Sequence, residues 1–157
     1  MIWVEVLRVT VPGQPQPKAR PRCQCVNHKP RLYKDGKTRA YENYIAQCVW
    51  GVSRAYRGKP RPLCGDSDPV RVEIKAVFKR PEYMKAKRYP DGLIPHTKKP
   101  DGDNITKVVL DSLNQLGGLV WGDDCQVSSH DTNKFYSERD GDPYLEIALF
   151  VPGEDAE

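Results

Sequence analysis

The stretch Val70-Arg-Val-Glu-Ile-Lys-Ala-Val-Phe-Lys79 carries the clearest structural signal in the sequence. Apolar residues recur at every second position, which is the period of a β-strand with one buried face. The residues expected on that face are Val70, Val72, Ile74, Ala76 and Phe78. The other elements are therefore expected to pack against a sheet that contains residues 70–79.

The residues before this strand predict a second strand and an extended arm. Apolar residues alternate through residues 2–11, and Pro12-Gly13 ends the pattern. Four prolines from Pro12 to Pro21 exclude a helix and favour an extended arm over residues 14–22. The basic residues expected to project from this arm are Lys18, Arg20 and Arg22.

Two segments have the periodicity of amphipathic helices. In residues 38–56 the apolar stripe comprises Tyr41, Tyr44, Ile45, Cys48, Val49, Val52 and Tyr56, with Asp35 or Thr38 as the cap and Gly58 at the end. In the second helix the stripe comprises Ile105, Val108, Val109, Ser112, Leu113 and Leu116, with Asp101 or Asp103 as the cap and Gly117-Gly118 at the end. Between them, residues 80–100 contain four prolines and six basic residues and predict a long loop.

The remaining signals complete an α+β fold in the order β-α-β-α-β-β. A strand is expected from Gln126 and another over residues 144–151, joined by the turn Asp140-Gly-Asp-Pro143. We expect a single domain over residues 1–152, a mixed β-sheet covered by two main helices, and a frayed tail over residues 153–157.

The composition indicates a globular domain with an uneven charge distribution. The 157 residues are 38% hydrophobic and 29% charged, without an apolar run long enough to cross a membrane or a signal peptide, so a cytoplasmic location is expected. Residues 1–62 carry a net charge of +10, residues 63–100 carry +4 and residues 101–157 carry −10. This asymmetry suggests a polyanionic partner for the first part and metal ions for the last, although two differently solvated surfaces would give the same pattern.

The five cysteines are odd in number and scattered, which favours reduced thiols over a disulfide framework. Cys23-Gln-Cys25 followed by His28 offers only three local ligands, and their spacing does not match a zinc finger.

The sharpest local feature is Asp101-Gly-Asp103 at the start of the second helix. Two carboxylates separated by one small residue can converge on a divalent cation, and Lys107 lies one helical turn after Asp103. Asp123-Asp124 could add a third carboxylate if residues 118–121 run back antiparallel to the helix, which would complete a Mg²⁺ site for phosphoryl transfer. The alternative is structural: Asp101 and Asp103 would be helix caps, Asp103, Lys107 and Asp111 an ion-pair ladder, and Asp123-Asp124 a turn.

Three motifs in the right order resemble a known family. They are Pro100-Asp-Gly-Asp-Asn-Ile-Thr-Lys107, Asp111-Ser-Leu113 and Val120-Trp-Gly-Asp-Asp-Cys-Gln-Val127, and the early basic segment Pro15–Arg22 accompanies them. Together they resemble the RusA family of Holliday junction resolvases. The resemblance implies a homodimeric, Mg²⁺-dependent endonuclease, with Mn²⁺ as a substitute, that nicks two opposed strands of a four-way DNA junction. It also suggests a phage or prophage origin.

By motif match, the resemblance assigns Asp101, Asp103 and Asp124 as catalytic metal ligands, Asp123 as a supporting metal ligand and Lys107 as the catalytic lysine. The candidate phosphate contacts are Lys18, Arg20, Arg22, Arg31, Lys34, Lys37, Arg39, Lys98 and Lys99. Tyr33 or Tyr41 could stack on a base, although Tyr41 also fits the core. The alternatives are a nuclease acting on other branched or nicked DNA and a non-catalytic protein that binds branched DNA.

Overall fold

The strand β4 (Val70–Phe78) lies at the centre of a mixed sheet. The sheet order is β1-β7-β4-β6-β5, in which β4 runs parallel to β6 and antiparallel to β7. The computed structural model describes residues 1–56 and 62–154. The other sheet strands are β1 (Trp3–Pro12), β5 (Ile94–Pro95), β6 (Val127–Tyr136) and β7 (Tyr144–Pro152). The predicted mixed α+β architecture is confirmed.

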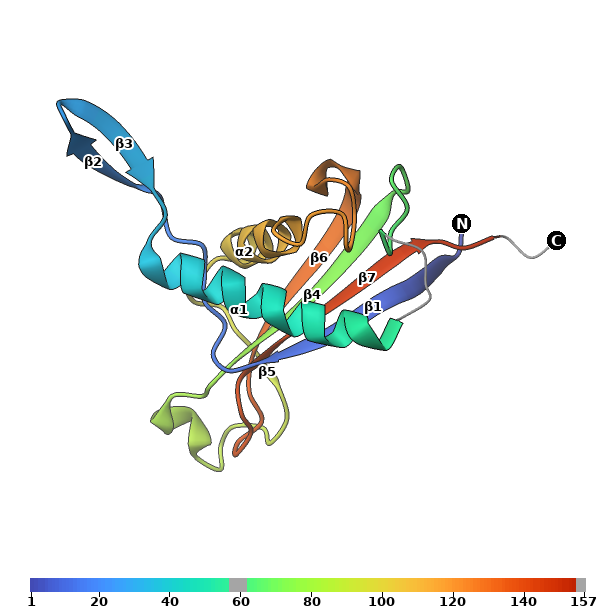
Figure 1. Ribbon diagram of the computed structural model, residues 1–157. Helices are drawn as coiled ribbons and strands as arrows, with labels where there is room; N and C mark the ends of the chain where they lie inside the picture. Colours follow the sequence, from blue (N-terminus) through green and yellow to red (C-terminus); the bar gives the residue numbers. More distant parts are fainter. Residues whose placement is uncertain (57–61, 155–157) are drawn as a thin grey trace.

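Two helices cover one face of this sheet. α1 (Gly36–Ser53) packs on β1, α2 (Gly102–Asn114) packs on β6, and the helices contact each other (Figure 1). The predicted apolar residues of β4 face them, since each is at most 3% exposed. The short 3-10 helices are η1 (Arg54–Tyr56), η2 (Glu82–Lys85) and η3 (Asp124–Gln126). No helix in the described ranges is long and apolar enough to span a membrane.

β1 departs from simple alternation. Its register against β7 shifts between Glu5 and Leu7, so Leu7, Val9 and Val11 are buried whereas Val4 is 47% exposed. A bulge places two residues opposite one and moves the buried face by one position.

The helix starts follow the sequence signals, whereas both helices end a few residues before the predicted glycines, α1 at Ser53 and α2 at Asn114. Asp35 caps α1, its carboxylate accepting a hydrogen bond from the backbone N–H of Lys37 at 3.1 Å. Gly117 and Gly118 follow α2 with positive φ values of 43° and 75°, which glycine adopts without steric cost. The predicted end of the first helix at Gly58 lies outside the described residues, as do residues 155–157 of the predicted frayed tail. Gly153 is held by a hydrogen bond from its backbone N–H to the Ile2 carbonyl at 2.7 Å.

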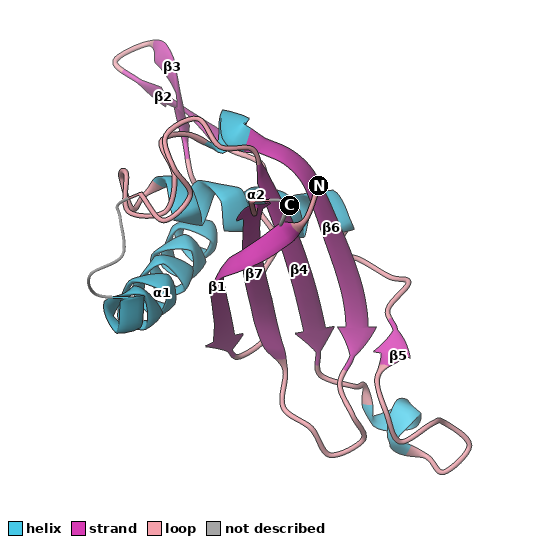
Figure 2. Ribbon diagram, turned by 90° about the vertical axis from the view of Figure 1, so that its right-hand side faces the viewer, coloured by secondary structure: helices cyan, strands magenta, loops and turns pink. Residues whose placement is uncertain are grey.

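The sequence interpretation missed a two-stranded ribbon, β2 (Arg22–Val26) and β3 (Lys29–Tyr33). The ribbon projects away from the sheet and the helices (Figures 1 and 2). Its two-residue loop, Asn27-His28, has φ values of 52° and 61°, the conformation of a type I′ hairpin turn.

The long loop after β4 is an ordered structure, seen below the sheet in Figure 2. The guanidinium of Arg80, 3% exposed, donates hydrogen bonds to the carbonyls of Ser137, Met84, Pro90 and Gly92 at 2.6–3.0 Å. The loop also contributes β5, which pairs with the end of β6.

Candidate metal centre and nucleic-acid interface

The Asp-Gly-Asp motif forms the first turn of α2. Asp101 is the N-cap residue, yet its side chain makes no capping hydrogen bond, and Asp103 follows in the first turn. Both side chains are exposed, and neither forms a hydrogen bond or ion pair with another described residue. The first turn of a helix also favours negative ligands and charges through its free N–H groups. The structure therefore leaves both carboxylates available to a ligand.

Lys107 is also available to a ligand. It is exposed one turn after Asp103, and it forms no ion pair with the part of the chain that is described. The alternative of an ion-pair ladder through Asp103, Lys107 and Asp111 is not realised, because Asp111 pairs with Lys18 instead. An ammonium group next to two free carboxylates suits a site where a phosphate must be both bound and neutralised.

Contacts with β6 fix the start of α2. The hydroxyl of Thr106 donates to the Gly102 carbonyl at 3.0 Å and lies 2.6 Å from the hydroxyl of Thr132. The ammonium of Lys134 donates to the carbonyls of Lys98 and Pro100 at 2.7 and 2.8 Å, which holds the chain that leads into the motif. The backbone around Asp101 is therefore set by the neighbouring strand.

The second acidic pair lies in the turn before β6. Asp124 begins η3, and Asp123 caps it in a reciprocal arrangement with Gln126, whose amide also donates to the carbonyl of Gly65 at 2.7 Å. Hydrogen bonds from the Cys125 thiol and from Asp124 lower the pKa of Asp123. Gln126 lies in the third sequence motif but was assigned no role from it, although its spacing from Asp123 is that of a capping box.

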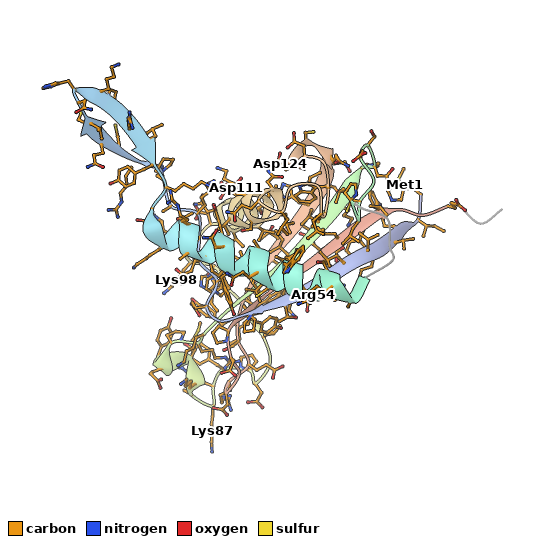
Figure 3. All side chains as sticks on the ribbon, viewed as in Figure 1. Met1, Arg54, Lys87, Lys98, Asp111 and Asp124 are labelled. Carbon is orange, nitrogen blue, oxygen red and sulfur yellow. The ribbon has the colours of Figure 1, made fainter. Side chains whose placement is uncertain are left out.

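The sequence left open whether residues 118–121 run back antiparallel to α2. Residues 119–121 form no strand; the carbonyls of Leu119 and Val120 accept hydrogen bonds from Leu63 and Cys64 at 3.1 and 2.8 Å. The indole of Trp121 donates to Asn114, the last residue of α2, at 2.8 Å. From Asp101 to Asn114 the helix rises about 20 Å, so this anchor lies at the far end of α2 from the motif. Figure 3 shows Asp124 and Asp111, both labelled, on the same side of the molecule.

The structure does not gather Asp101, Asp103 and Asp124 into one cluster. Among residues 1–56 and 62–154, no group of three or more His, Cys, Asp or Glu side chains could hold a metal ion. Asp101 and Asp103 alone still fit a magnesium ion, because Mg²⁺ is commonly held by one or two carboxylates and keeps several waters. The Cys23, Cys25 and His28 set forms no such group either, and all five cysteines are free thiols.

The candidate phosphate contacts fall into two groups. Lys18 does not project from the arm as predicted: its ammonium pairs with Asp111 and lies 3.8 Å from Glu42, because these two carboxylates are within its reach. Lys34 pairs with Glu42 at 2.9 Å. Lys34 is nevertheless exposed, and so is Arg22, which lies 3.3 Å from Asp35. The exposed candidates that form no ion pair with another described residue are Arg20, Arg31, Lys37, Arg39, Lys98 and Lys99.

The ribbon has two chemically different faces. Its register pairs Cys23 with Leu32 and Cys25 with Pro30, and alternation places these four residues on one face. The opposite face carries the pairs Arg22 with Tyr33, Gln24 with Arg31, and Val26 with Lys29. Tyr33 is 42% exposed on this basic face, whereas Tyr41 is only 7% exposed and belongs to the core, where burial raises its pKa.

Free carboxylates beside a lysine on α2, together with an exposed basic ribbon, suit an enzyme that acts on the phosphodiester backbone of a nucleic acid. The family model described as Endodeoxyribonuclease RusA matches residues 12–149, and the chain belongs to this family. It is therefore an endodeoxyribonuclease of a family that binds branched DNA and depends on divalent metal ions. It is also similar to "Uncharacterized protein YqaN" of Bacillus subtilis (strain 168), with 29% identity over 151 residues that cover 93% of this chain and 96% of the relative.

Proposed function

We propose that this chain is a Mg²⁺-dependent nuclease that resolves four-way DNA junctions by paired symmetric nicks. The observation that carries the proposal is the first part of α2, where Asp101, Asp103 and Lys107 are exposed and uncommitted in a chain of the RusA family. The proposed site of action is the cytoplasm.

Asp101 and Asp103 would hold the metal ion, with Mn²⁺ as a substitute for Mg²⁺. Asp124 and Asp123 lie outside this pair in the structure, so they are proposed as further ligands in the metal-bound state only. A bound divalent ion supplies Lewis acidity at a phosphate and lowers the pKa of a water molecule. Lys107 would stabilise the negative charge that grows on the phosphate oxygens. Two exposed carboxylates with a lysine one turn away are consistent with this division of roles.

The basic side of the molecule would hold the DNA. Residues 18–34 contain six Lys or Arg and no Asp or Glu, and a two-stranded ribbon has the width to enter a DNA groove. The exposed Arg22, Arg31 and Lys29 would contact phosphates, while Tyr33 on the same face would stack on an unpaired base. Such contacts make affinity fall steeply with salt.

A homodimer is proposed because two opposed nicks on a symmetric junction need two active sites related by a two-fold axis. Sedimentation of the purified protein, with and without a junction, would test the dimer directly. A monomer that cuts both strands only in separate encounters would contradict paired nicking.

The test of the chemistry is cleavage of a synthetic four-way junction by the wild type and by Asp103→Asn. Loss of one metal ligand is expected to lower the Mg²⁺-dependent rate by roughly a thousandfold or more while binding stays measurable. Asp131→Asn is the matched control, since Asp131 is an exposed carboxylate on β6 that bonds only Asn133. Full cleavage by Asp103→Asn would refute the proposed site, and equal cleavage of linear, flapped and four-way DNA would refute junction selectivity.

A further inference from the structure

Glu42 is a buried carboxylate that no motif or periodicity in the sequence singles out. Its side chain is 0% exposed, and burying an ionised carboxylate is costly unless it is paired. Oε2 accepts hydrogen bonds from the ammonium of Lys34 at 2.9 Å and from the amide of Gln115 at 3.1 Å. The ammonium of Lys18 lies 3.8 Å from Oε1.

Both stems of the projecting ribbon meet at this carboxylate. Lys18 precedes β2 by four residues, and Lys34 directly follows β3. The stem before β2 is further tied by the backbone N–H of Ala19, which donates to the hydroxyl of Thr38 in α1 at 3.0 Å. The ribbon itself is exposed except at Val26, which is half-buried. Its orientation relative to the domain is therefore set by the stems.

The same cluster is built into the helix that carries the Asp-x-Asp motif. Lys18 pairs with Asp111, and its backbone N–H donates to the carbonyl of Asn104 at 3.2 Å, next to Asp103. Gln115, at the C-terminal end of α2, completes the contacts to Glu42. Asp103, Lys107, Asp111 and Gln115 lie at successive four-residue intervals of α2.

We propose that Glu42 is a positioning residue that fixes the DNA-holding ribbon at a defined angle to α2, so that a phosphate held by the ribbon is aligned with Asp101 and Asp103. The inference rests on the proposed function for the reaction that it serves. Glu42 touches no substrate; it acts through Lys34 and Lys18.

Stabilisation of the fold does not by itself explain the contacts of Glu42. Oε1 of Glu42 has no hydrogen-bond partner although it is buried, and buried ion pairs can often be replaced by apolar side chains without loss of stability. An apolar contact, however, would not fix two separate lysines at one point. A charged anchor with several directional contacts defines the angle of the stems.

The first readout compares binding with cleavage in wild type and Glu42→Gln, an isosteric change that removes the charge. At saturating protein, the single-turnover rate on a four-way junction is expected to fall on the order of 10- to 100-fold, because small misplacements of reacting groups cost this much. Binding should be retained, because Arg20, Arg22 and Arg31 are unchanged. Glu146→Gln is the control: Glu146 pairs with Arg8 at 2.7 Å on the face of the sheet away from the helices, and its rate should be unchanged.

Lys34→Gln provides a second variant, since Lys34 is 44% exposed and its loss leaves the core intact. Lys34→Gln should also lower the single-turnover cleavage rate. The double variant should cleave no more slowly than Glu42→Gln alone, because the effects of residues that act through each other do not add. Additive losses at saturating protein would overturn the proposal.

The second readout is limited trypsin digestion of the folded protein, which does not require DNA cleavage. Trypsin must take a freed lysine side chain into its own acidic pocket, so initial cleavage after Lys34 and Lys18 reports release of the stems. In Glu42→Gln these two rates are expected to rise about tenfold through local opening, while cleavage after Lys87 in the other loop stays constant.

Unchanged stem cleavage, or a rate of DNA cleavage equal to wild type, would overturn the inference. An equal rise at all trypsin sites would indicate general destabilisation and would also overturn it. Absence of any junction cleavage by the wild type would refute the proposed function instead, and the trypsin comparison would still decide whether Glu42 holds the stems.

Discussion

The ribbon β2–β3 and the loop of residues 79–93 are both basic, yet they use their charges in opposite ways. In the loop, Arg80 is buried and donates hydrogen bonds to five carbonyls, Lys85 pairs with Glu82 at 2.9 Å, and Asp91 pairs with Arg139 at 2.7 Å. In the ribbon, the basic residues are exposed, and the one acidic partner is Asp35 at the base, 3.3 Å from Arg22. Arg80 and Lys85 therefore stabilise the loop itself, although Lys79, Lys87 and Arg88 are exposed, whereas the basic residues of the ribbon stay available to a ligand.

The contacts that fix the two segments also lie in different places: within the loop in one case and at the base of the ribbon in the other. The loop is organised around one guanidinium, that of Arg80, which binds the carbonyls of Met84 and of residues 90–92 within the loop and that of Ser137 just after β6. The ribbon is organised from its base, where its stems meet at Glu42. We therefore expect loop substitutions to change stability and ribbon substitutions to change DNA binding.

Arg80→Met should have the largest effect on stability, because it keeps the length of the side chain and removes its hydrogen bonds. Leaving several carbonyls without donors is expected to lower the free energy of unfolding by about 3–5 kcal/mol, measured by urea denaturation. Arg88→Met is the control within the same loop, since the Arg88 guanidinium only rests over the Tyr89 ring at 5.2 Å, and it should cost about 1 kcal/mol or less. Equal losses for the two variants would show that the loop is not built around Arg80.

Arg31→Ala should have a smaller effect, confined to DNA binding. Loss of one phosphate contact is expected to lower the slope of log affinity against log salt by about 0.9, with stability changed by no more than about 0.5 kcal/mol. Arg88→Ala, an equally cationic change in the loop, should leave the salt slope unchanged. Fluorescence anisotropy with a labelled junction would measure the salt slopes of both variants, each made in the Asp103→Asn background. Equal slopes for the two variants would remove the distinction between ribbon and loop.

The same contrast explains what the sequence could predict. The strand β4 was predicted because its alternation reflects burial on one face, and every residue of that face is buried. The ribbon was missed because it has no buried face: Leu32 is 75% exposed, and alternation between Cys23 and Gln24 carries no hydrophobic signal. The available hint was Asn27, a residue that tolerates the positive φ of a two-residue hairpin turn.

The site was predictable only where its parts are local. Asp101, Asp103 and Lys107 lie within one helix, so their spacing predicts their proximity, and the structure leaves all three free. The position of Asp124 depends on how Trp121 and Leu119 pack after α2, which spacing does not determine. Glu42 is a tertiary feature as well, because its partners come from residues 18, 34 and 115.

The smallest expected effect concerns His96, which should contribute a pH dependence to the stability of the fold. His96 lies on the side of the molecule that carries the loop of residues 79–93. Its ring packs between Phe78 and Tyr136, with centroids at 4.7 and 4.3 Å. Burial, followed by the charge of Lys134, lowers the pKa of His96. The unfolded chain therefore binds a proton more readily than the folded one, so this stabilisation is present above the ordinary histidine pKa of about 6.5 and is lost as pH falls below it.

His96→Phe should remove that component. Between pH 7.5 and 5.5 the melting temperature of the wild type is expected to fall more than that of His96→Phe, and His130→Phe, a change at an exposed position on β6, should follow the wild type. The junction affinity of His96→Phe at pH 7.5 should match wild type, because the His96 ring is buried and the proposed DNA contacts of the ribbon, Arg22, Lys29 and Arg31, are unchanged. A loss of affinity without a change in the melting profile would mean that the loop side also takes part in DNA binding.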